Sequence, residues 1–113
     1  MDFLHHLRTG QYSFIKGTQD FINEHYSELL YNPEIQGQAF DPALKLNTQI
    51  NQKEATLYLF LDLDLKALDQ INIHLLLAQP LKEDINHIFT EDTKEITPKK
   101  LSEKLISFLN EIH

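Results

Sequence analysis

Apolar residues recur three or four positions apart between Tyr12 and Tyr31, which is the spacing of one face of an α-helix. The positions that follow this spacing are Phe14, Thr18, Phe21, Ile22, Tyr26, Leu29 and Leu30. Pro33 comes shortly afterwards, and the residue before a proline avoids the α region. The pattern therefore predicts a long helix over residues 12–31.

The segments on either side of this helix are expected to be irregular. Ahead of it, Asp2 is suited to cap a short turn that runs through Leu7 and closes at Gly10. After it, residues 32–42 are rich in proline and glycine, and this composition predicts a loop.

From Leu44 onward the spacing of apolar residues changes from 3.6 to 2, which indicates β-strands. Strands are predicted over residues 44–50, 55–64 and 71–78, with a polar turn at 51–54. The third strand should end before Pro80, because proline lacks the amide that continues a ladder. The short links favour an antiparallel meander, since a parallel crossover needs about a dozen residues or more.

One register brings all the apolar positions to the same face of this sheet. Ile50 is placed opposite Ala55 in the first hairpin, and Leu63 opposite Ile71 in the second. The shared face then carries leucine and isoleucine from every strand, and the long helix is the expected cover.

The tail predicts a second helix. Thr97 is suited as N-cap with Pro98 at the first helical position, and the helix should run to the end of the chain. Its apolar stripe is Leu101, Leu105, Phe108, Leu109 and Ile112. Residues 81–96 are expected to form a short helix and then irregular or extended chain. The alternative is two extended segments, 85–90 and 94–97, around a turn.

The fold class expected from these elements is α+β, with an antiparallel meander of three or more strands and both helices packed on it. At 113 residues, the chain (1–113) is expected to be one domain.

The other face of the predicted sheet carries an apolar island with an acidic border. Tyr58 falls opposite Leu76 and Phe60 opposite His74. The carboxylates near one end of this face are Asp62, Asp64 and Asp69. An apolar island with a polar rim is typical of a protein contact surface, so these seven residues are the candidate protein-binding site. The alternative is that the tail helix or residues 81–96 cover this face.

Composition narrows the classes of partner. Ten basic and seventeen acidic residues give a formal charge of −7, which disfavours nucleic acid and anionic membrane surfaces and favours a basic protein. There is no cysteine, which fits a reducing compartment, and no apolar segment is long enough to span a membrane. The cytoplasm is therefore the expected location.

No catalytic, cofactor or metal site is predicted. A calcium loop beginning at Asp62 fails, because Lys66 and Ala67 stand where a ligand and glycine are required. His74 near Asp62 could form an acid–base pair, but no nucleophile accompanies it. A half-buried histidine beside Phe60 is the favoured interpretation.

The expected function is therefore that of a small acidic, non-catalytic module that binds another protein. By analogy of class, this size and charge are common among inhibitors such as bacterial immunity proteins, whose carboxylates complement a basic cleft. Small acidic secretion chaperones, which often form homodimers, share the profile. The sequence is also compatible with a small enzyme that uses His74 and Asp62, and with a homodimer that pairs through the second sheet face or the free edge strand.

Overall fold

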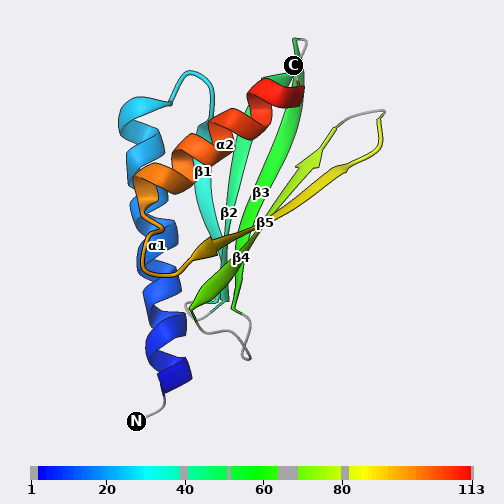
Figure 1. Cartoon of the computed structure of the whole chain (residues 1–113). Coiled ribbons are helices and arrows are strands. Elements are labelled where there is room, and N and C mark those ends of the chain that lie inside the picture. The colour runs from blue at the N-terminus through cyan, green and yellow to red at the C-terminus, as the bar shows by residue number, and fades with distance from the viewer. Residues whose placement is uncertain (1–2, 39–40, 51, 64–68, 80–81, 113) are drawn as a thin grey trace.

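The computed structural model describes residues 3–38, 41–50, 52–63, 69–79 and 82–112. In chain order the elements are α1 (Phe3–His25), β1 (Tyr31–Gln38), β2 (Asp41–Ile50), β3 (Lys53–Leu63), β4 (Gln70–Ala78), β5 (Ile85–Asp92) and α2 (Pro98–Ile112). The strands form one five-stranded antiparallel sheet in the order β1-β2-β3-β4-β5, and both helices lie on the same face of it (Figure 1). The α+β class, the meander and the two covering helices are confirmed.

The core lies between the helices and that face of the sheet. The helices contribute Ile15, Ile22, Leu101, Leu105, Phe108 and Leu109. At every second position, the three central strands contribute leucine or isoleucine, except for Thr48 and Ala55. The helices also meet each other: a Cβ added to Gly17 of α1 would lie 2.8 Å from Cγ of Pro98 in α2. Glycine therefore permits a close helix–helix approach.

The register of the second hairpin is confirmed, and that of the first is shifted by two residues. Leu63 pairs with Ile71, as predicted, whereas Ile50 pairs with Lys53 and not with Ala55. A link of only two residues joins β2 to β3, and Gln52 in it has a φ of 68°, the left-handed conformation typical of such tight hairpins. An even shift preserves the face of every side chain, so the predicted leucine face survives the error.

The predicted limits of the first helix are wrong at both ends. The chain is helical from Phe3 to His25, so no turn closes at Gly10, and Asp2 lies outside the described residues. A lone glycine costs about 1 kcal/mol relative to alanine, which is too little to end a long helix. At the other end the chain leaves the helix after His25, and the hydroxyl of Thr48 donates a hydrogen bond of 2.8 Å to the carbonyl of Leu29.

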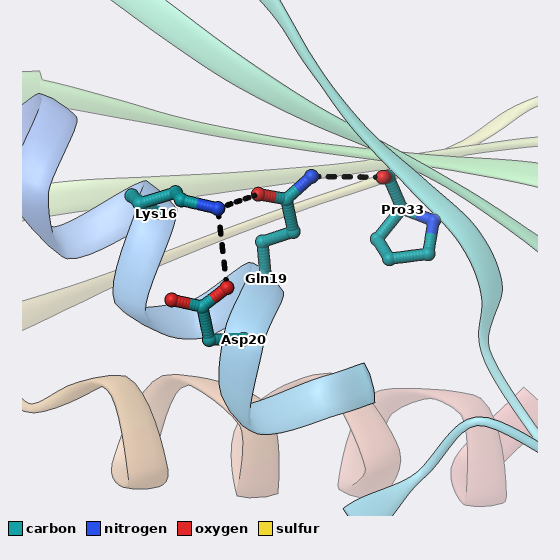
Figure 2. A network of polar contacts seen from close by, with 4 residues as sticks. All are labelled: Lys16, Gln19, Asp20 and Pro33. Carbon is teal, nitrogen blue, oxygen red and sulfur yellow. Dashed lines mark hydrogen bonds and ion pairs between the residues drawn. The ribbon is translucent and has the colours of Figure 1, made fainter. Parts of the chain in front are cut away.

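The predicted loop over residues 32–42 is also wrong, because most of it forms β1. Proline is tolerated there because β1 is an edge strand, and a register shift between Tyr31 and Glu34 accommodates it. Figure 2 shows how α1 holds this edge: the side-chain amide of Gln19 donates a 2.9 Å hydrogen bond to the carbonyl of Pro33.

The short helix predicted after Pro80 is replaced by β5, which pairs with β4 in an unbroken register from Leu77↔Ile85 to Gln70↔Asp92. The alternative of an extended segment over 85–90 is confirmed. Its proposed partner, 94–97, is wrong, because the strand continues to Asp92 and the chain then turns into α2. Apolar positions at 85, 88 and 89 fit either period, and pairing with β4 decides between them.

The tail helix is confirmed with its predicted cap. α2 begins at Pro98, and the Thr97 hydroxyl accepts a 3.2 Å hydrogen bond from the amide of Lys100.

Candidate functional site

One face of the sheet remains uncovered among the described residues. Because α1 and α2 share the opposite face and β5 extends the sheet sideways, neither the tail helix nor residues 82–96 pack on it (Figure 1). The side chains directed to this open face are the odd-numbered ones of β2 and the even-numbered ones of β3, β4 and β5. The alternative that the tail helix or residues 81–96 cover this face is therefore wrong for the described residues.

An apolar cluster occupies the middle of the open face, and we call it the open-face patch. It consists of Ala43, Tyr58, Phe60, His74, Leu76 and Ile88. The register places these side chains in two neighbouring rows, with Phe60 between Ala43 and His74 and with Ile88 beside His74. Phe60 is 37% exposed and Ile88 59% exposed, so water reaches large apolar surface here.

His74 is packed within this patch against Phe60. Its ring stacks on Phe60 with centroids 4.8 Å apart and planes 11° from parallel. Its Nε2 lies 3.7 Å from an oxygen of Asp62, beyond hydrogen-bond length, and is buried with no hydrogen-bond partner among the described residues. The predicted proximity to Asp62 is confirmed, but a buried ring nitrogen is poorly placed to exchange a proton with a ligand.

The border of the patch is polar and mainly acidic. Asp62 pairs with Asn72 in the register, and the Asn72 side chain accepts a 2.7 Å hydrogen bond from the hydroxyl of Thr90. Among the strand residues whose side chains the structure describes, the charged ones that the register directs to this face are Glu34, Glu54, Asp62, Asp92 and a single cation, Lys45. This excess of carboxylates would attract a basic partner.

The three predicted acids do not form one cluster. Asp62 lies on the open face, and Asp69 stands exposed just before β4, where its carbonyl accepts a bond from the amide of Thr93. Asp64 lies outside the described residues. Within the described part of the chain, no three histidine or acidic side chains are grouped as a metal ion would require.

A shallow hollow adjoins the patch at Thr56 and Ala78, the small residues next to Tyr58 and Leu76 on the open face. It encloses about 400 Å³ and is lined by Asn47, Glu54, Ala55, Thr56, Ala78 and Gln79. A carboxylate and two amides beside an alanine floor form a setting suited to a long cationic side chain.

Sequence reasoning missed Ala43 and Ile88 as members of the patch. The helix predicted after Pro80 hid the strand parity of Ile88, and Ala43 fell next to the predicted loop. The signal for Ile88 was present, because the segment Ile85 to Thr90 also fits an extended strand.

Comparisons with protein-family models, with curated proteins and with solved structures found no match. None of the helices in the described part of the chain combines the length and the apolar character needed to cross a bilayer.

Proposed function

We propose that this protein is a non-catalytic binding module that docks another protein on its open sheet face, and that it acts as an inhibitor of the immunity type. The observation that carries the proposal is the position of both helices on one face, which leaves Tyr58, Phe60, Leu76 and Ile88 on the other face of the sheet. A folded chain gains nothing from wetting large apolar side chains, so such a patch with a polar rim is best explained by a partner.

The partner that fits best is a protein with a basic surface. Support comes from the net charge of −7 and from the carboxylates that border the patch. In this arrangement the aromatic residues supply contact area, and Asp62 and Glu54 accelerate the encounter. Carboxylates around an aromatic centre are also what an inhibitor needs to block a cationic cleft, and the absence of cysteine suits action in the cytoplasm.

A homodimer of the secretion-chaperone type is the second candidate, because the same uncovered face could pair with a copy of itself. Mutual repulsion of two acidic chains makes it the weaker proposal. Sedimentation over a range of concentrations separates the two: a monomer at all concentrations favours a foreign partner, and a dimer favours the chaperone type.

The direct test begins with identification of the partner by photo-crosslinking. A photoreactive amino acid that replaces Tyr58 should crosslink to one protein in cells. The same amino acid in place of Glu24 on α1 should not crosslink to that protein. The captured protein is then purified, and its association rate is measured against salt concentration. The double variant Asp62→Asn/Glu54→Gln should flatten the salt dependence.

Glu24→Gln/Glu103→Gln is the matched control, because it removes the same charge from exposed positions on the two helices. If the two double variants change the salt dependence of association equally, the carboxylates near the patch act only through the net charge of the protein. Equal crosslinking from residues 58 and 24 would overturn the docking face itself.

A further inference from the structure

The two edges of the sheet differ in how well they are protected. Unpaired edge strands invite additional strands, and proteins block them with prolines, bulges or covering elements. β1 has these protections: Pro33 lies within it, its register shifts after Tyr31, Gly37 has a φ of 87°, and Gln19 bonds to its backbone (Figure 2). β5 contains neither proline nor glycine, and its register with β4 has no bulge.

β5 is also accessible. In the described part of the chain it pairs on one side only, with β4, and most of its residues are exposed. Its sequence, INHIFTED, is rich in β-branched and aromatic residues, which favour the extended conformation.

Contact sites for an added strand exist on both sides of this edge. On the open face, Ile88 brings the patch to the edge strand. On the helix face, a hollow of about 170 Å³ opens between β5 and α2, lined by His87, Phe89, Lys104, Ser107, Phe108 and Glu111. The rings of His87 and Phe108 stack there at 5.5 Å, and Lys104 lies over Phe89. Alternate side chains of an added strand would reach these two sites in turn.

The charges at the ends of β5 indicate which kind of strand can pair with it, a second copy of β5 or a segment of another protein. Glu83, Asp84 and Asp92 are exposed at the two ends of β5, whereas Glu91 is already paired with Lys104. If two copies paired through β5 with Ile88 at the centre, Asp84 of each copy would face Asp92 of the other. Like charges opposite one another destabilise strand pairing, whereas a segment with basic ends complements β5.

We infer that β5 accepts, as a sixth strand, an extended segment of the partner that has apolar residues in its middle and lysine or arginine at its ends. This inference rests on the proposed function and adds a mode of recognition to it. Backbone hydrogen bonds to β5 supply affinity, and the hollow between β5 and α2 selects an apolar side chain.

The probe is a capped peptide of about ten residues in which valine and threonine alternate around a central phenylalanine, with two lysines at each end. Two isomers carry N-methyl groups on one or the other set of alternate amides. Only one set of amides in a strand can face β5, so one isomer should bind at least about tenfold more weakly and the other should bind unchanged. Amide exchange should show new protection at the amides of Ile85–Asp92 that face the free edge and are not already bonded to β4.

Two substitutions on α2 test the hollow. Ser107→Trp fills it from an exposed position and should weaken peptide binding at least about tenfold. Glu103→Trp places the same ring on α2 outside the lining of the hollow and should leave binding unchanged.

Equal binding of both methylated isomers, no binding of the unmethylated peptide at about 1 mM, or a β5-mediated dimer in the free protein would overturn the inference. The Phe60→Ser variant, which alters the open-face patch and not β5, tests the inference about β5 separately from the proposed function. If this variant no longer binds the purified partner but still binds the peptide, the result supports both the open-face proposal and the inference about β5. If the Phe60→Ser variant still binds the partner and its β5 amides become protected, only the open-face proposal is contradicted. If the two methylated isomers bind equally and the variant no longer binds the partner, only the inference about β5 is contradicted.

Discussion

The two faces of the central strands carry similar residues in different surroundings. Leu75 and Leu76 are neighbours in β4; Leu75 is 1% exposed beneath the helices, whereas Leu76 lies half-buried on the open face. The helix face is filled by aliphatic side chains that contact one another, while the open face mixes aromatic rings with amides and carboxylates. The comparison indicates that the packed core lies on one face, whereas the proposed docking surface lies on the other.

The largest effect on stability is expected from Leu75→Ala. It removes buried side-chain volume from a packed core and should lower the free energy of unfolding by about 2–5 kcal/mol, measured by urea denaturation. Leu76→Ala is the matched control on the open face, and its cost should stay near or below about 1 kcal/mol. Similar losses from the two variants would contradict the difference between the faces.

Gly17→Ala is expected to have the next largest effect, because its new methyl group would lie against the Pro98 ring. Overpacking of this kind costs about 1–3 kcal/mol, more than the helix propensity gained from alanine. In a Pro98→Ala background the same substitution should become neutral or stabilising. Destabilisation of equal size in both backgrounds would show that the ring contact is not the cause.

A smaller effect is expected where α1 holds the edge strand β1. Gln19→Ala removes the hydrogen bond to Pro33 and should cost about 0.5–1.5 kcal/mol. Lys16→Ala breaks only the exposed 3.2 Å ion pair with Asp20 and a bond to Gln19, and should cost about 0.5 kcal/mol or less (Figure 2). Thermal denaturation of both variants measures the two losses of stability. A larger loss from Lys16→Ala than from Gln19→Ala would contradict this prediction.

Ile88→Ser is also expected to have only a small effect on stability, at or below about 1 kcal/mol, because the side chain is more than half exposed. A loss like that of Leu75→Ala would mean that Ile88 belongs to the core and not to a docking surface. Circular dichroism during urea titration measures both variants.

The fold was largely predictable from the sequence because alternation of leucines fixes which side chains share a face. The pairs Tyr58–Leu76 and Phe60–His74 follow from parity and short links alone, and the structure confirms them. The two-residue error between β2 and β3 arose because Lys53 and Glu54, which extend β3, are polar enough to suggest a turn. Turn length is set by backbone conformation at Gln52, which polarity does not reveal.

Both missed strands lie at the edges of the sheet. Pro33 and Gly37 suggest a loop, yet an edge strand tolerates them because one side of it forms no ladder. In β5 the spacing of Ile85, Ile88 and Phe89 also fits a helix, and only pairing with β4 settles the matter. The open-face patch was therefore predicted without Ile88, the member nearest the free edge.

The central claim is that the open-face patch binds the partner, and the dissociation constant of the purified partner tests it most directly. Tyr58→Ser/Phe60→Ser should weaken binding at least about 100-fold while the urea midpoint shows that the chain remains folded. A dissociation constant within about threefold of the wild-type value would contradict the claim.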